Sequence, residues 1–310
     1  MLFAIYFVLL LLMFYIGTAG WSYKDWEGIV YPLKKETGFH ALVFLSRFLN
    51  FVEINSTFYR QPIFNIALSW VKRVEHLQVF LFAVKLNQVF THTKGDFSQI
   101  DVDQFKSGIE PLITNNRLAA ILVQFPWSFA YTDSNLEYMI NLFRIFSGYP
   151  LTLEIRQGKW DHPDFFKTLS EYKVGFCNID QPVFKNSISP SSHSTNPEFS
   201  YVRLHGRNYK NWFKKDAGRD ARYDYLYSND ELDSWIKRIK ELGKKSKNVY
   251  IVTNNHYRGQ AMANALQLKN KISGEKLDIP FKLLKHYPVL KDIAKRIEKG
   301  QMDLFDDEQT

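Results

Sequence analysis

Apolar and polar residues alternate through one short stretch of the chain, and this alternation predicts a β-strand. In residues 51–58 (FVEINSTF), Glu53, Asn55 and Thr57 are polar, whereas the residues between them are mostly apolar. A period of two is that of a strand with one polar and one apolar face. A carboxylate, an amide and a hydroxyl beside so apolar a run favour a site over a solvent-exposed face.

Short apolar strands alternate with helical patterns along the rest of the chain, which is typical of parallel βαβ units. Strands are predicted at residues 14–21, 51–58, 80–87, 119–125, 151–156, 174–180, 201–206 and 249–255. Helices are predicted at residues 39–49, 63–74, 102–113, 136–146, 163–171, 230–242, 259–268 and 287–299. Residues 181–200 contain three prolines and seven serines or threonines, so this crossover is predicted to be mostly loop.

Eight strands in this order predict an α/β fold, a single closed (β/α)8 TIM barrel. No glycine-rich dinucleotide or P-loop fingerprint follows the first strand, and this counts against an open doubly wound sheet. The expected organisation is an apolar leader at residues 1–12, a barrel domain at residues 13–300 and an exposed tail at residues 301–310.

The leader has no charge, since Lys24 is the first charged residue of the chain. A signal peptide opens with a positive segment, and a membrane span needs about 20 apolar residues, so the run fits neither well. We expect Met13 to be the native start, with a membrane anchor or signal as the alternative, and membrane association is not expected. The single cysteine, Cys177, excludes a disulfide framework and suits a reducing, cytoplasmic setting.

Polar residues recur at the carboxyl ends of the predicted strands, where TIM barrels place their functional groups. They are Glu53, Asn55, Thr57, Lys85, Asn87, Gln124, Thr152, Glu154, Arg156, Asn178, Asp180, Arg203, His205, Arg207, Asn254, Asn255 and His256. The alternative is a buried lattice of ion pairs that plugs the barrel. Buried ion pairs are weak evidence for stability, so a functional site at this end is the favoured interpretation.

Seven spaced motifs give the chain a resemblance to a known family. They are GTAGWSYKDWEGIVYP (17–32), VEINSTFYRQP (52–62), FAVKLNQVFTH (82–92), VQFPWSF (123–129), LEIRQGKW (153–160), YVRLHGR (201–207) and NNHYRGQAMANA (254–265). In these motifs the chain resembles the YecE-like proteins, domain of unknown function 72, over residues 14–268. The resemblance implies a TIM barrel distantly similar to the xylose-isomerase and endonuclease-IV barrels, with no settled activity. The family usually begins close to its GT-x-GW motif, which supports Met13 as the start.

A divalent metal ion is one ligand that the strand ends could hold. The oxygen and nitrogen donors for it are Glu53, Glu154, Asp180, His205 and His256. Four cations lie at the same strand ends, namely Lys85, Arg156, Arg203 and Arg207. Such cations repel a divalent ion, and the sequence has no HExxH-type ligand pair. A metal is therefore not favoured, and the identity of any cofactor stays open.

An anionic ligand fits the charge of the chain better, because the net charge is +8 and the pI about 9.2. Residues 205–225 interleave cations with aromatic residues: Arg207, Tyr209, Lys210, Trp212, Phe213, Lys214, Lys215, Arg219, Arg222, Tyr223 and Tyr225. Cations neutralise phosphates and aromatic faces stack on bases. We expect nucleic acid or a phosphorylated small molecule as partner; a solvated basic loop is the alternative.

The residues expected to bind this ligand are Trp21, Tyr23, Asn55, Thr57, Lys85, Gln124, Arg156, Asp180, Arg203, Arg207, Tyr223, Asn254, Asn255 and His256. For catalysis, Glu53 and Glu154 are expected to lie roughly across the barrel mouth, where two carboxylates could act as acid and base, or as nucleophile and acid. His205 is the further candidate for proton transfer near neutral pH. For each of these residues, the alternative to a functional role is a structural one.

The tail carries a separate motif. Residues 301–305 (QMDLF) resemble the pentapeptide by which bacterial replication and repair proteins bind the DNA sliding clamp. Gln301 offers amide hydrogen bonds, and Leu304 and Phe305 offer an apolar anchor for a hydrophobic pocket. The alternative is that these two apolar residues pack back onto the barrel.

Three hypotheses of function follow. The leading one is a DNA-associated barrel, a nuclease or repair hydrolase recruited by the clamp, although the sequence leaves open whether the protein is an enzyme. The second is a hydrolase or isomerase of a sugar or sugar phosphate that uses Glu53 and Glu154 as acid and base. The third is a non-catalytic module that binds an anion.

Overall fold

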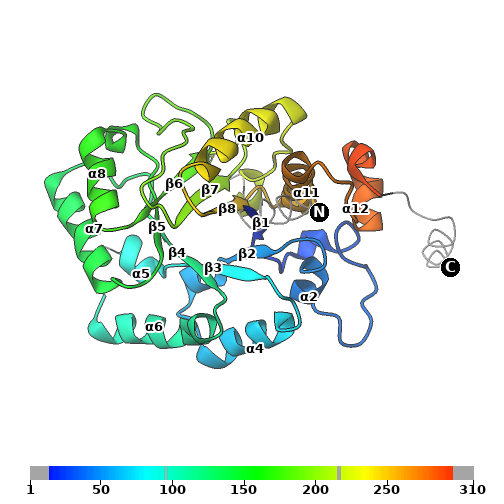
Figure 1. The fold of residues 1–310 in the computed structure, drawn as a ribbon, viewed down its shortest axis with the longest axis horizontal. Coiled ribbons are helices and arrows are strands. Elements are labelled where there is room, and N and C mark those ends of the chain that lie inside the picture. Colours follow the sequence, from blue (N-terminus) through cyan, green and yellow to red (C-terminus); the bar gives the residue numbers. More distant parts are fainter. Residues whose placement is uncertain (1–13, 94, 96, 215–217, 296–310) are drawn as a thin grey trace, which may run out of the picture.

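Eight parallel strands close into one barrel in the order of the sequence (Figure 1). The computed structural model describes residues 14–93, 95, 97–214 and 218–295. The strands are β1 (Phe14–Ala19), β2 (Phe51–Ile54), β3 (Leu81–Lys85), β4 (Leu118–Gln124), β5 (Leu151–Glu154), β6 (Gly175–Asp180), β7 (Phe199–Leu204) and β8 (Asn248–Thr253). Since β1 pairs with both β2 and β8, the sheet has no free edge, and the predicted (β/α)8 barrel is confirmed.

Helices surround this barrel as an outer layer (Figure 1). The longer ones are α4 (Phe64–Val74), α6 (Gln99–Thr114), α7 (Asp133–Ile145), α8 (Pro163–Glu171), α10 (Asn229–Gly243) and α11 (Gln260–Ser273). Short helices fill the connections: α2 (Ala41–Leu45), α3 (Ser56–Tyr59), α5 (Gln88–Thr91), α9 (Gly218–Ala221) and α12 (Phe281–His286). Among the described residues, none of the helices is both long and apolar enough to cross a membrane.

Side-chain caps set where the outer helices begin. Ser228 accepts a hydrogen bond from the backbone N–H of Glu231, whose carboxylate accepts one from the N–H of Ser228. This reciprocal capping box satisfies two backbone donors that the first turn would leave unpaired. Ser98 and Asp101 form the same arrangement at the start of α6. These caps position the helices that pack against the strands of the barrel.

An aromatic layer fills the barrel below its polar residues. Phe51 on β2 lies 6.3 Å from Tyr201 on β7, measured between ring centroids, although these two strands are not neighbours in the barrel. The rings therefore meet through the barrel interior. Tyr250 on β8 stacks on Phe51 at 5.3 Å. Because the hydroxyl of Tyr201 donates to Glu53 Oε2 at 2.9 Å, this apolar layer supports the polar layer directly.

The strand predicted at residues 51–58 is too long, because β2 ends at Ile54 and α3 begins at Ser56. Tertiary hydrogen bonds turn the chain here. The Thr57 hydroxyl donates to the carbonyl of Lys85 at 2.7 Å, and the Asn87 amide donates to the carbonyl of Thr57 at 2.9 Å. Glu53, Asn55 and Thr57 therefore do not share one strand face. This prediction was wrong because the alternation of polar and apolar residues continues past the end of the strand.

Other boundaries differ less. β1, β3, β5, β7 and β8 each end two residues before the predicted boundary. The crossover at residues 181–198 contains no helix or strand, which confirms the predicted loop. In place of the helix predicted at residues 287–299, the described part holds a 3₁₀ helix at Pro288–Ile293. The expected leader, the start at Met13 and the tail at residues 301–310 lie outside the described residues.

Candidate functional site

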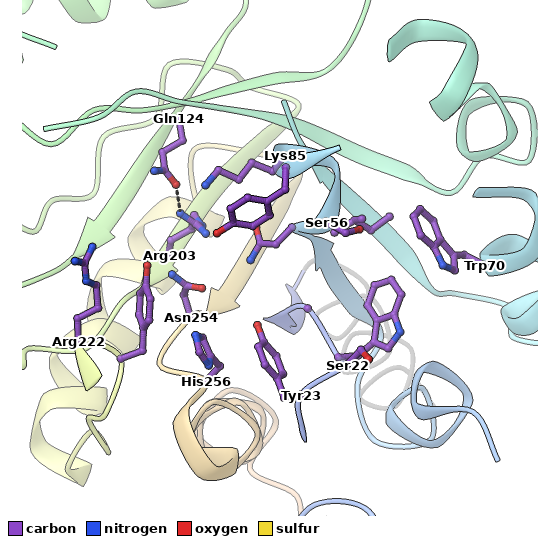
Figure 2. Close-up of a pocket in the computed structure, with 16 residues that line it drawn as sticks. Ser22, Tyr23, Ser56, Trp70, Lys85, Gln124, Arg203, Arg222, Asn254 and His256 are labelled. Carbon is purple, nitrogen blue, oxygen red and sulfur yellow. Dashed lines mark hydrogen bonds between the residues drawn. The ribbon is translucent and has the colours of Figure 1, made fainter. Parts of the chain in front are cut away.

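A cavity of about 640 Å³ opens at the carboxyl ends of the strands (Figure 2). We call it the mouth cavity. It is lined by Gly20, Trp21, Ser22, Tyr23, Ile54, Asn55, Ser56, Tyr59, Trp70, Lys85, Gln124, Arg203, Arg222, Tyr223, Asn254 and His256. Its volume falls within the range of small-molecule sites. The lining combines cations, amides, hydroxyls and aromatic rings, and none of its described residues is an Asp or Glu.

Arg203, on β7, joins the two glutamates below the cavity. Its side chain is only 1% exposed, and Nη2 donates to Glu53 Oε1 at 2.7 Å. Nη1 donates to Glu154 Oε2 and, at 3.1 Å, to Gln124 Oε1. Each carboxylate in this arrangement accepts charge-assisted hydrogen bonds, which are the strong kind. Both glutamates are fully buried, so they serve as fixed counter-charges to the guanidinium.

Glu154 has two further partners. Arg156 donates to its Oε1 from Nε at 3.1 Å and from Nη2 at 2.9 Å, and His205 Nε2 lies 3.2 Å from the same oxygen. Burial alone would raise the pKa of this carboxyl. Arg203, His205 and Arg156 outweigh it and hold the pKa of Glu154 well below its usual range. The side chain is therefore ionised at neutral pH.

His205 is neutral in this surrounding. It is fully buried, and burial followed by the charge of Arg203 lowers its pKa to about 3, against the opposing effect of Glu154. Its Nδ1 lies 2.8 Å from the amide nitrogen of Asn254. With that amide as donor, the ring proton resides on Nε2 and faces Glu154. A neutral histidine fixed by Asn254 at Nδ1, with Nε2 beside Glu154, is placed to orient its neighbours.

Lys85 extends from the end of β3 toward Gln124 and Arg203 (Figure 2). Its Nζ lies 3.9 Å from the centroid of the Phe58 ring. Burial, followed by the nearby charge of Arg203, lowers its pKa to about 7. No carboxylate lies within 4.0 Å of this ammonium among the residues that the structure describes. Lys85 is thus a cation that the cavity holds without an ion pair.

Aromatic rings form another part of the lining. Trp21 and Trp70 meet edge to face, with 5.7 Å between ring centroids. Tyr23 stacks on His256 at 4.5 Å with 8° between the planes, and Tyr223 lies 4.8 Å from the same imidazole. The Tyr23 hydroxyl donates to the carbonyl of Ala19. In Figure 2, Trp70 lies on the opposite side of the view from Gln124 and Arg222.

The sequence and structure of this barrel match those of known proteins. Residues 15–285 match the family described as "Protein of unknown function DUF72". The chain belongs to the DUF72 family. Its relatives include UPF0759 protein YunF of Bacillus subtilis (strain 168), which is 34% identical over 270 residues, 83% of this chain and 93% of YunF. The resemblance found in the seven motifs is thereby confirmed.

Two crystal structures of DUF72 proteins share the fold. The one from Thermotoga maritima MSB8 is 34% identical with a TM-score of 0.74 and covers 84% of this chain and 99% of that one. A protein from Enterococcus faecalis V583 is 26% identical with a TM-score of 0.74, covering 86% of this chain and 98% of that one. Both descriptions name the family and no activity.

The mouth cavity of this DUF72 chain brings many of the predicted ligand-binding residues together. Those that line it are Trp21, Tyr23, Asn55, Lys85, Gln124, Arg203, Tyr223, Asn254 and His256. The remaining predicted residues do not line it: Glu53, Thr57, Glu154, Arg156, Asp180, His205, Arg207 and Asn255. The structure thus separates the candidate acid–base groups from the cavity surface.

Asp180 and Arg207 belong to a neighbouring cluster. Arg207 Nε donates to Asp180 Oδ2 at 2.9 Å, and its Nη1 donates to Glu231 Oε1 at 3.1 Å. Burial raises the pKa of the Asp180 carboxyl although Arg207 opposes this. The amide of Asn255 donates to the carbonyl of Tyr225 at 2.7 Å. These contacts fasten the loop after β7 to the barrel.

The predicted site residues omit seven residues that line the cavity, namely Gly20, Ser22, Ile54, Ser56, Tyr59, Trp70 and Arg222. Ser56 and Tyr59 lie in or beside a segment predicted as strand, and α3 brings them to the cavity. Arg222 lies in the basic loop at residues 205–225, and the sequence does not distinguish it from the other cations there. Trp70 lies on the outer helix α4, and no sequence pattern distinguishes it from a core residue.

The donors proposed for a divalent metal do not fit one. Glu53 and Glu154 both accept from Arg203, and Asp180 accepts from Arg207. Within the described part of the chain, no three His, Cys, Asp or Glu side chains gather as metal ligands would. The donor set therefore favours fixed guanidinium groups over a metal ion.

Proposed function

We propose that this protein binds a phosphate-bearing ligand in the mouth cavity. One observation carries the proposal: among the described residues, the lining contains Lys85, Arg203 and Arg222 and no carboxylate. Within the part of the chain that the structure describes, neither Lys85 nor Arg222 has a carboxylate within 4.0 Å. Unpaired cations at a partly closed surface attract anions strongly, because low-dielectric walls weaken screening by water.

The two glutamates support this anion site indirectly. Their carboxylates hold Arg203, and neither lines the cavity. A sugar enzyme that used Glu53 and Glu154 as acid and base would need both groups at the substrate. Their burial weighs against that hypothesis. In the proposed function they keep a guanidinium charged and fixed at the base of the cavity.

The ligand also carries an unsaturated ring or another flat apolar group. Trp21, Trp70, Tyr23 and Tyr223 all line the cavity, and flat rings stack on aromatic side chains. A volume of about 640 Å³ accommodates a ligand of mononucleotide size. We therefore expect a compound that joins a phosphate to a planar group of this size.

A single-stranded nucleic acid is the second candidate, and a surface beside the cavity favours it. Phe213 is 55% and Tyr209 53% exposed. Phe213 packs 4.9 Å from Phe184 and 5.5 Å from Trp127, both half-buried, so aromatic rings gather on the loops after β4, β6 and β7. Bases could stack there while the adjoining lysines contact phosphates. Hydrolysis of DNA, binding of the sliding clamp through Gln301, Leu304 and Phe305, and a cytoplasmic location stay predictions.

Calorimetric titration with AMP and adenosine tests the proposed function. AMP is expected to bind at least tenfold more tightly than adenosine, because a charge-assisted hydrogen bond contributes about 1.5–3 kcal/mol. Lys85→Met and Arg222→Met should each weaken AMP binding by about the same factor. Lys269→Met is the matched control: this partly buried lysine on α11 donates to the carbonyl of Phe48 at 2.6 Å, away from the cavity.

The length of the ligand separates the two candidates. A 5′-phosphorylated oligothymidylate that binds more tightly than AMP, with a steep salt dependence lost in Phe213→Ala, would favour nucleic acid. Equal affinity for AMP and the oligonucleotide would favour the small molecule. Equal binding of AMP and adenosine, or binding of neither AMP nor the oligonucleotide, would contradict a phosphate site.

A further inference from the structure

Lys85 is a surplus cation in the polar layer at the base of the mouth cavity. Two carboxylates, Glu53 and Glu154, lie in this layer, and Arg203 and Arg156 neutralise them. With those ion pairs complete, Lys85 adds a third positive charge to two negative ones. An arginine does not release its proton in a protein, whereas a lysine does so readily when buried. Lys85 is therefore the cation of this layer that can release its proton.

The net effect of the groups around Lys85 is a lowered pKa of its ammonium. Arg203 and Arg156 disfavour its charged form, Glu154 and Glu53 favour it, and burial is the largest influence, so that the pKa of Lys85 falls to about 7. His92 packs against Phe58 at 4.8 Å and is neutral, since burial and then Lys85 lower its pKa to about 4. At pH 7 about half of Lys85 is then the free amine.

The position of the amine completes a nucleophilic site. Lys85 lies at the carboxyl end of a barrel strand, where this fold places reacting groups. Its side chain lines the mouth cavity, and the ring of Phe58 lies 3.9 Å from Nζ, so packing limits its rotamers. A neutral amine beside another cation is the arrangement by which lysines become nucleophiles toward carbonyl groups.

We propose that Lys85 forms an imine with an aldehyde or ketone that also carries a phosphate. This inference rests on the proposed phosphate site and names its substrate class. The Nζ lone pair forms a bond to the carbonyl carbon, and the π electrons move to the oxygen, which takes up a proton. The nitrogen loses its two protons, the oxygen takes up a second proton as the C–O bond breaks, and one water leaves. The amine and the carbonyl compound thus give the imine and water, with no change in oxidation state.

Fixed charges in the cavity suit this chemistry. Arg222 and Arg203 supply guanidinium groups, which bind phosphate as planar cations, so the anion is held even while Lys85 is neutral. A site with two permanent cations and one titrating amine can therefore hold the anion and react with the carbonyl at the same time. Glu53 and Glu154 keep Arg203 in place and take no part in the covalent step.

Trapping with pyridoxal 5′-phosphate tests the inference, because this probe joins an aldehyde, a phosphate and a planar ring. The full-length protein is mixed with a slight excess of the probe at pH 7 and reduced with borohydride, and peptide mass spectrometry locates the adduct. We expect one adduct per chain, on Lys85. The free-amine fraction of Lys85 exceeds that of an ordinary lysine on the order of a thousandfold at this pH.

Two variants make the result specific. Lys85→Arg should abolish the single adduct and retain more affinity for AMP than Lys85→Met does, because it keeps a cation and removes the nucleophile. Lys269→Met should still be labelled at Lys85. The rate of labelling should rise with pH to a plateau with a midpoint near 7, whereas an exposed lysine titrates at about 10.4.

Labelling spread over surface lysines, or a rate at Lys85 that still rises near pH 10, would overturn the inference. Pyridoxal without its phosphate separates this failure from that of the proposed function. If Lys85 reacts equally well with pyridoxal and with its phosphate, the amine is nucleophilic and the phosphate site is refuted. If AMP binds and neither aldehyde labels Lys85, the phosphate site stands and the imine is refuted.

Discussion

The guanidinium of Arg203 and the carboxylate of Glu53 meet across the barrel, with Nη2 of the arginine 2.7 Å from Oε1 of the glutamate. They come from β7 and β2, which are not adjacent strands, and both side chains are almost wholly buried. The second amino group of Arg203 joins Glu154 on β5. One guanidinium thus ties three separate strands together below the mouth cavity.

Replacing Arg203 by methionine should destabilise the fold strongly. Glu53 would lose its cationic partner and keep only the Tyr201 hydroxyl, and Glu154 would keep Arg156 but lose its second guanidinium. Breaking a buried ion pair in this way typically costs about 3–5 kcal/mol of the free energy of unfolding. Chemical denaturation followed by circular dichroism measures this change. Arg73→Met, an exposed arginine on α4, is the control and should shift stability by about 0.5 kcal/mol or less. A similarly small effect in Arg203→Met would show that the ion pairs add no stability.

Acid should weaken the fold through Glu154. Because its pKa in the folded protein lies well below the usual value, its contribution is complete above the unfolded-state pKa of about 4.3 and is lost as pH falls below it. We expect the free energy of unfolding to decline between pH 5 and the acid limit, and to decline less steeply in Glu154→Gln. Glu137→Gln, an exposed glutamate on α7, should keep the wild-type slope. Parallel slopes in wild type and Glu154→Gln would refute this origin.

His205 should remain neutral from pH 8 down to pH 5. Its pKa of about 3 in the folded protein lies below the ordinary value of about 6.5, so its neutral form favours folding above pH 6.5 and this contribution declines as pH falls toward 3. Imidazole nitrogen shifts in NMR spectra, assigned with His205→Asn, report the charge directly. We expect no titration of this ring between pH 5 and 8. A midpoint near 6.5 would contradict the neutral, oriented role.

The fold as a whole could be predicted from the sequence, because eight strand patterns recur, seven of them followed by a helical pattern, and strand ends are polar. The site could be predicted only in part. Lys85, Gln124, Arg203 and Asn254 follow from their places at strand ends. Arg203 and Glu53 are 150 positions apart, so their pairing depends on barrel closure. Because of this pairing, the Glu53 carboxylate does not line the cavity. Trp70 reaches the cavity only through the packing of its helix.

Lys85→Met should leave the fold as stable as wild type or make it more stable. Removing the surplus cation relieves its repulsion with Arg203 and Arg156, and the methionine side chain replaces most of its packing. The free energy of unfolding is expected to change by about 1 kcal/mol or less, while affinity for AMP declines. Comparison with Arg203→Met distinguishes a cation that binds the ligand from a cation that stabilises the fold. A loss of several kcal/mol would assign Lys85 to the structural lattice.

The most direct test of the phosphate site is a crystal structure of the protein soaked with AMP. We predict density for the nucleotide in the mouth cavity, with phosphate oxygens about 2.7–2.9 Å from Lys85 Nζ or from the guanidinium of Arg222 and the base against the aromatic lining. A cavity free of nucleotide at saturating AMP, or a phosphate bound away from both cations, would contradict the account.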